Sequence, residues 1–288
     1  MTDADDYCQE KAVKSGSSFY YSFLFLNTTQ RQAITAVYAF CREVDDIVDD
    51  CSDMQVASTK LKWWQTELDR VFKGEASHPV GRALQVALKT YGLPKILFEE
   101  IVNGMGMDLQ FQGYRTFADL EVYCHCVASA VGLLIIEIFG YTNEKTRVFA
   151  SQLGIAFQLV NIIRDVGEDA LRGRVYLPEE DLERFGLKAE AILNRQPSEE
   201  FERCMRFQAQ RAREFYDKAL EHLSPQDRGP QLPALIMARI YFTLLDEIEK
   251  ANFQVLKQSI KLTPLRKLWL AFKCYWQEKR LRKRVKSL

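Results

Sequence analysis

The chain has 288 residues, and its 39 lysine and arginine residues balance its 39 aspartate and glutamate residues. A formal net charge of zero excludes a protein that binds nucleic acid through its overall charge, so no nucleic-acid partner is expected. The seven cysteines form no C-x-x-C pair and no secretory signal opens the chain, which predicts a reduced, cytoplasmic protein.

Glycine (14) and proline (8) are sparse, and they mostly interrupt helical patterns, as at Gly74 to Pro79 and Gly229 to Pro233. Strand-like alternation is hard to find, and no linker, repeat or low-complexity tract divides the chain. We therefore expect an all-α fold in one domain, residues 1–288, with helices around a central cavity and a basic tail from about residue 279. The longest apolar stretch is broken by Glu137, which predicts that no segment reaches the roughly 20 residues needed to span a membrane.

Near the start, residues 15–23 combine serine hydroxyls with aromatic side chains before a helical pattern. Serine hydroxyls at a helix N-terminus can donate hydrogen bonds to phosphate oxygens. An ordinary helix cap is an equally good interpretation of these residues taken alone.

The first acidic cluster is Asp45-Asp46-Ile47-Val48-Asp49-Asp50, which follows an apolar stretch from Ile34 to Val44. Tyr38, Arg42, Asp45 and Asp49 are spaced by four, three and four residues, so they share one face of a helix. A solvated helical face usually mixes Lys and Glu, whereas this stripe holds only Asp, Arg and Tyr. This cluster alone does not decide between a site and a solvated face, and a second cluster with the same spacing favours a site.

Three further tracts in the first half resemble sites but lack a required part. Cys124-His125-Cys126 points to different helix faces, and Glu75-x-x-His78 occurs only once, so neither predicts a metal centre. Gly104-Met105-Gly106 has no third glycine and no preceding strand, which excludes a dinucleotide fingerprint. We expect the cysteines to pack in the core and these glycines to allow close helix packing.

The second acidic cluster lies in residues 161–169, after an apolar stretch from Leu153 to Val160. Gln158, Asn161, Asp165 and Asp169 also share one helical face. Carboxylates four residues apart repel each other, so two such stripes require a cation between them. Carboxylate and amide oxygens are the ligands that magnesium prefers.

After this cluster, Arg172-Gly173-Arg174 forms a basic segment whose arginines can bind a diphosphate bidentately. Away from the acidic cluster, the two arginines would be ordinary solvated loop residues. Pro178 is expected in the first turn of a new helix, with Glu179, Glu180 and Asp181 near its positive end.

At the C-terminus, residues 266–288 carry nine basic side chains against the single acid Glu278, with Trp269, Phe272, Tyr275 and Trp276 between them. Aromatic side chains beside basic ones are typical of a segment that lies on anionic lipid. We therefore expect peripheral contact with the inner face of a membrane. The alternative is a solvated tail with the aromatics packed inward.

Taken together, these motifs resemble the squalene/phytoene synthase family over Tyr7 to Phe272. The resemblance is carried by Ser18-Phe19-Tyr20-Tyr21, Tyr38 to Asp49, Tyr123 with Val127 to Gly132, Gln158 to Asp165, and Gly173 to Pro178. Within the family, Ser17 to Leu26, Cys41 to Asp46 and Lys60 to Trp64 are most similar to the presqualene diphosphate synthases of bacterial hopanoid pathways.

The resemblance implies an isoprenoid synthase fold and a role for each matching residue. Asp45 and Asp49 match the first aspartate motif and Asn161, Asp165 and Asp169 the second, where two or three magnesium ions bridge to diphosphate. Substrate-binding positions are Ser18, Tyr21, Tyr38, Arg42, Gln158, Asn161, Arg164, Arg174, Tyr176 and Tyr241, and catalytic positions are Tyr38, Arg42, Asp45, Asp49, Asp165 and Asp169. Gly16 and Lys257-Gln258 depart from the family's pattern, so no role is transferred to them.

The implied reaction condenses two farnesyl diphosphates head-to-head into presqualene diphosphate and diphosphate, with magnesium and without a nicotinamide. Tyr38 and the released diphosphate are both candidate proton acceptors. The enzymatic alternative is a phytoene or dehydrosqualene synthase that carries the cyclopropyl intermediate on to a hydrocarbon. A catalytically inactive helical interaction protein is the other alternative, although both acidic motifs are intact.

Overall fold

The computed structural model describes residues 3–14, 22–23, 25–51 and 53–286, and these contain helices and no strand. The all-α prediction is confirmed. In chain order the helices are α1 (Asp3–Lys14), α3 (Thr28–Asp50), α4 (Met54–Lys73), α5 (Pro79–Tyr91), α6 (Lys95–Leu109), α7 (Phe117–Cys124), the π-helix η1 (His125–Ser129), α8 (Ala130–Phe139), α9 (Lys145–Leu171), α10 (Glu179–Phe185), α11 (Ala189–Leu193), α12 (Glu199–His222), α13 (Leu232–Lys250) and α14 (Pro264–Lys286).

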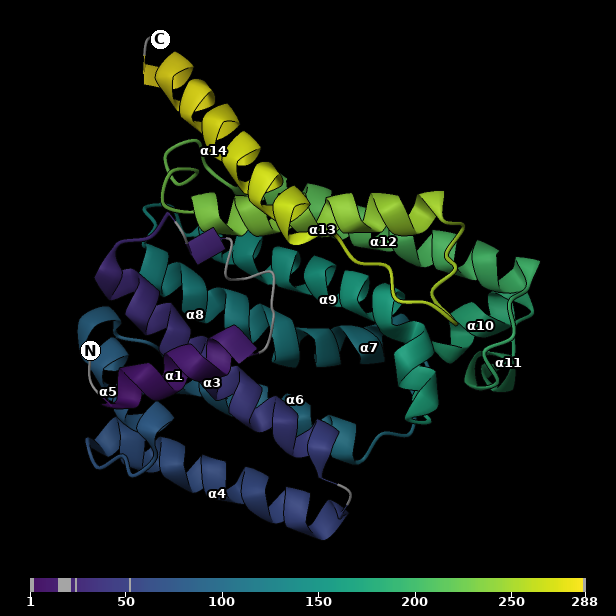
Figure 1. Ribbon diagram of the computed structural model, residues 1–288, viewed down its shortest axis with the longest axis horizontal. Helices are drawn as coiled ribbons and strands as arrows, with labels where there is room; N and C mark the ends of the chain where they lie inside the picture. Colours follow the sequence, from purple (N-terminus) through teal and green to yellow (C-terminus); the bar gives the residue numbers. More distant parts are fainter. Residues whose placement is uncertain (1–2, 15–21, 24, 52, 287–288) are drawn as a thin grey trace.

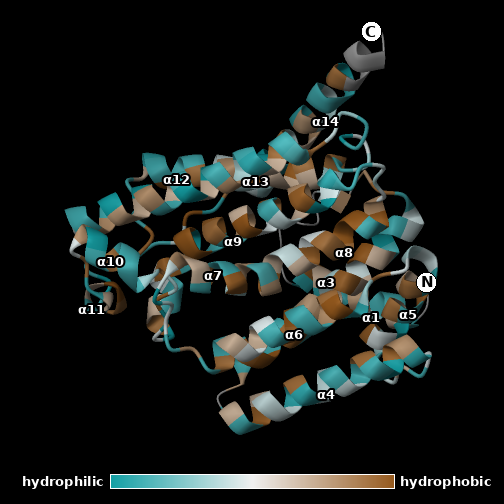
Figure 2. Ribbon diagram, turned by 180° about the vertical axis from the view of Figure 1, so that it is seen from behind, coloured by the Kyte–Doolittle hydropathy of each residue, from teal (hydrophilic) through white to brown (hydrophobic). Residues whose placement is uncertain are grey.

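The helices lie in stacked rows (Figure 1), from α4 at one edge through α3 and α6, then α8 and α9, to α12 and α13. Helix α14 packs on α13 and leaves the body of the molecule at an angle, so residues 279–286 continue a helix and do not form a separate tail. Figure 2 shows the most hydrophobic ribbon along α8 in the interior and hydrophilic ribbon along the outside of α12.

Local capping sets where the first acidic helix begins and where its neighbour begins and ends. Asn27 precedes α3, and its Oδ1 accepts a hydrogen bond from the Gln30 amide at 2.9 Å. Asp53 caps α4 in the same way, and Gly74 ends that helix in the left-handed conformation that glycine adopts without strain.

The predicted start of α10 was off by one residue, because Pro178 is the N-cap and the helix starts at Glu179.

The buried side chains form two clusters with a seam between them. One cluster joins α1, α3, α4, α5, α6 and α8, and the other joins α7, α9, α12, α13 and the start of α14. Val127 and Ala234 pack against both clusters. The seam between the clusters contains the cavity described below, because residues of both clusters line it.

The π-helix η1 is held between two glycines on neighbouring helices. A Cβ at Gly104 would lie 2.6 Å from Cγ1 of Val127, and one at Gly154 would lie 2.7 Å from the Ser129 backbone. The expectation of close packing is therefore confirmed for Gly104. It is wrong for Gly106, where a Cβ would meet no atom within 4 Å, so that glycine imposes no such constraint. Cys124 is buried, as the core-packing interpretation predicted, whereas Cys126 is only half-buried.

Two continuous helical stretches, Phe117–Phe139 and α9, are long and apolar enough to cross a membrane. The expectation that Glu137 interrupts such a stretch was wrong, because Glu137 stays within α8 and pairs with Arg147 and Tyr141. In the most apolar windows, 50% and 61% of the residues are buried inside the molecule. Both stretches are core helices that wall the cavity, and such helices pass the same test in soluble proteins.

Candidate active site

Helix α3 presents Arg42 and the first aspartates together. The Arg42 Nη1 lies 2.6 Å from Oδ2 of Asp45, and its other terminal nitrogen contacts Asp46. Lys11 of α1 lies 2.9 Å from both Asp46 and Glu43, so α1 supports the back of this helix. Arg42 is thus shared between two carboxylates, Asp45 and Asp46, and Asp46 is also paired with Lys11.

Helix α9 presents the second acidic stripe. The Arg164 Nε lies 2.7 Å from Oδ1 of Asp165, with a second contact between the same two side chains. The amide nitrogen of Asn161 donates to Gln158 at 3.2 Å. The Oδ1 of Asn161 is buried and accepts no hydrogen bond from the residues that the structure describes, so one oxygen of this stripe is available to a ligand.

The Arg172-Gly173-Arg174 segment connects the two stripes. Arg172 Nη1 lies 3.2 Å from Oδ1 of Asp49, and Arg174 Nη1 lies 3.8 Å from the same oxygen. Gly173 has a φ of +74°, which allows the sharp turn between the two arginines. The sequence placed these arginines beside the second cluster, and the structure brings them onto the first as well.

Asp108 of α6 belongs to the site but was missed from the sequence. It is 7% exposed, and its two oxygens accept hydrogen bonds from Tyr176 and Tyr123, each at 2.8 Å. Arg174 Nη1 is 3.5 Å from the Tyr176 hydroxyl, which links this carboxylate to the arginine segment. Asp108 stands alone between Met107 and Leu109. The signal that could have found it is a single acid on the apolar face of a helix, in line with Ile101 and Met105.

The carboxylates of these helices raise one another's proton affinity. Burial raises the pKa of Asp45 to about 6, with Arg42 opposing the shift and Asp49 adding to it. Burial raises the pKa of Asp169 to about 7, with Asp165 adding to the shift and Arg172 opposing it. The charge of Asp108 adds to both shifts, so the acidic groups of α3, α6 and α9 face one common space.

This space suits a cation shared with a ligand better than a protein-only metal cage. In the described part of the chain, no three His, Cys, Asp or Glu side chains converge closely enough to hold a metal ion. Magnesium is usually bound by one or two carboxylates together with substrate phosphates. The unpartnered Asn161 oxygen and the mutually repelling aspartates fit that arrangement.

A mostly apolar cavity leads away from the acidic stripes. Tyr38, Gln158, Asn161 and Tyr241 line its polar part, and the Tyr241 ring packs on Phe157 with centroids 4.6 Å apart. The remaining lining residues are Ser22, Phe23, Cys41, Val127, Ala128, Val131, Gly132, Ile135, Ile136, Phe139, Phe149, Ala150, Leu153, Gly154, Phe157, Pro233, Ala234 and Met237.

The far end of the cavity lies where α8 ends and α13 begins. The Gln231 side chain donates to the Gly140 carbonyl at 2.9 Å, which holds these two helix ends together. Along α9, Phe149 is nine residues from Gln158, or about 14 Å. Phe139, Phe149 and Pro233 therefore line the end remote from the aspartates.

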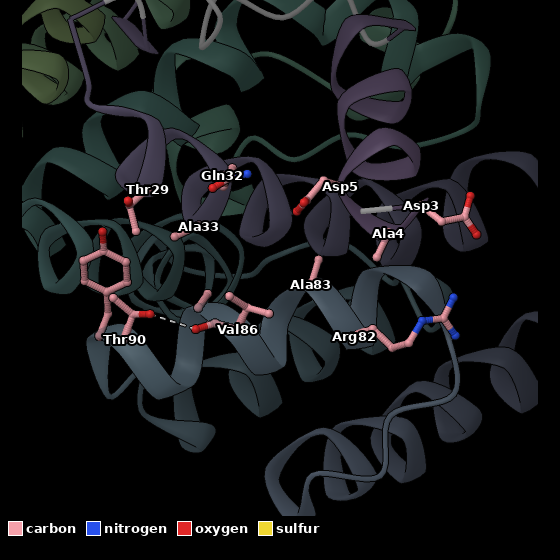
Figure 3. A pocket seen from close by; sticks show the side chains of 12 residues that line it. Asp3, Ala4, Asp5, Thr29, Gln32, Ala33, Arg82, Ala83, Val86 and Thr90 are labelled. Carbon is pink, nitrogen blue, oxygen red and sulfur yellow. Dashed lines mark hydrogen bonds between the residues drawn. The ribbon is translucent and has the colours of Figure 1, made fainter. Parts of the chain in front are cut away.

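Of the predicted site residues, Ser18 and Tyr21 lie outside the described residues. All the others fall in or beside this space, on α3, α9, α13 and the loop at Arg174 to Tyr176. A second hollow, between α1, α3 and α5 (Figure 3), is lined by Asp3, Gln32, Arg82 and Thr90 among others. The Thr90 hydroxyl there donates to the Val86 carbonyl at 3.0 Å, and the hollow shares no residue with the acidic stripes.

Comparison with known proteins gives a consistent family match. The squalene/phytoene synthase family model matches residues 12–266. The chain is 33% identical over 280 residues to 15-cis-phytoene synthase of Synechococcus elongatus, covering 93% of this chain and 91% of that protein. It is 35% identical over 273 residues to phytoene synthase of Arthrospira platensis, covering 89% and 87%.

Solved structures agree with the sequence relatives. A dehydrosqualene synthase in complex with ligand superposes with a TM-score of 0.88 at 30% identity, covering 96% of this chain and 97% of that chain. Squalene synthase HpnC from Alicyclobacillus acidocaldarius superposes with a TM-score of 0.76 at 29% identity, covering 87% and 94%. The similarity therefore extends over nearly the whole chain.

Proposed function

Because the chain belongs to the squalene/phytoene synthase family, we propose that it is a prenyltransferase that joins two identical allylic prenyl diphosphates head-to-head. One observation carries the proposal: two aspartate stripes, on α3 and α9, are linked through Arg172 and Asp49 beside a deep apolar cavity. The acidic and basic groups suit a diphosphate with its metal ions, and the cavity suits a prenyl chain.

The polar end of the cavity binds and orients the diphosphates. Asp45, Asp49, Asn161, Asp165 and Asp169 would hold magnesium, which, when bound, supplies positive charge to the leaving diphosphate. Arg42, Arg164, Arg172 and Arg174 each pair with an aspartate. A diphosphate with its magnesium ions offers these arginines new anionic partners and relieves the repulsion among the carboxylates.

The apolar part of the cavity protects an allylic cation from water. Its aromatic side chains, including Phe157 and Tyr241, present ring faces that attract positive charge. Tyr38 lies at the polar end, beside Gln158 and Asn161, where it is a candidate proton acceptor alongside the released diphosphate. The far end, at Phe139 and Phe149, limits how long a prenyl chain the cavity accepts.

The names of the relatives favour a hydrocarbon product. The two sequence relatives above are phytoene synthases, and the structure with the higher TM-score is a dehydrosqualene synthase. We therefore take as the first candidate an enzyme that carries the cyclopropyl diphosphate on to a hydrocarbon. This replaces the sequence-based preference for an enzyme that stops at presqualene diphosphate for hopanoid synthesis.

Presqualene diphosphate synthase remains the second candidate because three segments, Ser17 to Leu26, Cys41 to Asp46 and Lys60 to Trp64, resemble that subgroup. Trp64 packs on Phe40 and His78, with centroids 5.4 and 5.0 Å away, and none of these residues lines the cavity. The Lys60 to Trp64 motif therefore supports a relationship to that subgroup without selecting the product.

All seven cysteines are free, which supports the proposed cytoplasmic location.

One incubation separates the candidates. The purified protein is given farnesyl diphosphate, geranylgeranyl diphosphate or both, with magnesium and without a nicotinamide, and the products are analysed by mass spectrometry. A hydrocarbon with two diphosphates released per condensation supports the first candidate. A cyclopropyl diphosphate with one diphosphate released supports the second. Failure to condense either substrate would overturn the proposed reaction.

A further inference from the structure

Helix α14 carries a stripe of large apolar side chains that the described part of the protein leaves exposed. Leu265, Trp269, Phe272 and Trp276, which we call the α14 stripe, are 80%, 57%, 47% and 54% exposed. They are spaced by four, three and four residues, so they share one helical face. The opposite side is buried through Leu270, Ala271 and Cys274. The inward-packing alternative is therefore wrong for both tryptophans of this helix.

Basic side chains border the α14 stripe. The Nζ of Lys273 lies 4.7 Å from the Trp269 ring centroid, and that of Lys279 lies 5.0 Å from the Trp276 centroid. The single acid of α14, Glu278, is 6% exposed and is paired with Arg228 at 2.6 and 2.9 Å. The positive charge around the stripe therefore faces outward without an acid of its own helix to offset it.

The α14 stripe adjoins the wall of the active-site cavity. Phe25 stacks on Tyr275 with centroids 5.0 Å apart and meets Phe272 edge-on at 5.7 Å. Phe23, two residues earlier, lines the cavity. Towards its C-terminal end, α14 leaves the body of the molecule (Figure 1).

We propose that α14 binds the surface of a bilayer that contains anionic lipid, with the α14 stripe at the level of the headgroups and the flanking lysines and arginines on the lipid charges. Exposed tryptophans beside lysines match the two requirements of an interfacial helix, an apolar face and a basic border. A protein partner would need an apolar groove with acidic groups at its rim. An anionic bilayer supplies both an apolar interior for the α14 stripe and negative headgroups for the basic side chains. This inference concerns binding alone and does not depend on the proposed reaction.

Vesicle co-sedimentation of the full-length protein tests the proposal. Phosphatidylglycerol in phosphatidylcholine is compared with phosphatidylcholine alone, at low and high salt. We expect binding only to the anionic vesicles and weaker binding at high salt. Lys273→Gln and Lys279→Gln should each weaken binding about fivefold. The double variant Trp269→Ser/Trp276→Ser should lose most of its binding to anionic vesicles. The control is the double variant Met54→Ser/Val86→Ser, which changes two exposed apolar residues on α4 and α5 and should bind like the wild type.

Three results would overturn the proposal. These are absence of wild-type binding to anionic vesicles at low salt, unchanged binding of the tryptophan double variant, or a wild-type dimer in light scattering that this variant converts to a monomer. The last result would make the α14 stripe an interface between copies of the chain. Prenyl transfer is assayed in parallel without vesicles, so an inactive wild type would count against the proposed function and not against membrane binding.

Discussion

At the scale of single residues, Asp108 holds the loop after the second acidic stripe in place. It accepts hydrogen bonds from Tyr123 on α7 and Tyr176 beyond the arginine segment, and the Arg174 guanidinium approaches Tyr176. Burial raises the pKa of Asp108 while the two tyrosine hydrogen bonds lower it. We therefore propose that Asp108 is a positioning residue that acts on diphosphate binding through Tyr176 and Arg174.

We predict that Asp108→Asn weakens diphosphate binding without preventing folding. An asparagine oxygen accepts from one tyrosine, and its amide group faces the other hydroxyl, so Tyr176 and Arg174 lose their fixed position. The cost to stability should be about 1–3 kcal/mol. The KM for prenyl diphosphate and the affinity for inorganic diphosphate measure the effect. Tyr123→Phe is the control, because it removes only the bond remote from Arg174. Unchanged diphosphate affinity in Asp108→Asn would disprove the positioning role.

We predict that Asp49→Asn and Asp165→Asn each reduce turnover at least about a hundredfold. Each change removes a proposed magnesium ligand, and neither residue is a core contact, so helical content measured by circular dichroism should stay at the wild-type value. Asp50→Asn is the matched control, because Asp50 ends the same helix but lies off the helical face that Asp45 and Asp49 share. Full activity in EDTA, or near-wild-type rates in either variant, would contradict a metal-dependent site.

At the scale of elements, α9 must lie very close to η1 for the cavity to exist in its present form. Gly154 faces the Ser129 backbone and also lines the cavity, together with Val127 and Ala128 of η1. The π-helix is a local widening that is frequent at functional sites, and here it forms part of the cavity wall. The shape of the cavity therefore depends on a contact between two backbones.

We predict opposite effects for alanine at two helical glycines. Gly154→Ala places a Cβ 2.7 Å from backbone atoms and should destabilise the fold by about 1–3 kcal/mol, because α9 must move away from η1. Gly106→Ala, with no atom within 4 Å, should be stabilising by about 0.5–1 kcal/mol through helix propensity. Urea unfolding measures both values. A Gly154→Ala variant that is as stable as the wild type would refute the close contact.

At the scale of the whole molecule, Asp227 connects the segment before α13 to the start of α9. It accepts hydrogen bonds from the Thr142 amide and hydroxyl at 2.8 Å, the Asn143 amide at 3.0 Å and the Thr146 hydroxyl at 2.6 Å. Burial alone would raise the pKa of Asp227, but these hydrogen bonds outweigh it and lower the pKa. The charged form is therefore the one that stabilises the fold.

We predict that Asp227→Asn lowers the free energy of unfolding by about 1–3 kcal/mol at neutral pH. Because the folded pKa lies below the unfolded value of about 3.9, the wild-type advantage should be complete above that pH and should be lost as the pH falls through the folded pKa. Urea unfolding of both proteins at pH 7, 5 and 3 follows the difference. A difference that is the same at all three values would contradict the linkage.

Features set by local periodicity were readable from the sequence of this protein. The all-α class and the two acidic stripes were predicted correctly, because the helical repeat of 3.6 residues places Asp45 beside Asp49 and Asn161 beside Asp165 whatever surrounds them. Contacts between helices were not readable in this way. The pairing of Arg172 with Asp49, the Asp108 hydrogen bonds and the π-helix between Gly104 and Gly154 join residues on separate elements.

The C-terminal helix α14 also has features that the sequence determined and one that only the tertiary structure decided. The sequence determined that tryptophans alternate with lysines and arginines from Arg266 onward, but its periodicity left open which side of the helix would pack. The tertiary structure decided it, because α13 covers Leu270 and Cys274 and leaves Trp269 and Trp276 outside. A pattern along one helix defines which side chains share a face, and only packing against a neighbour determines which face is buried.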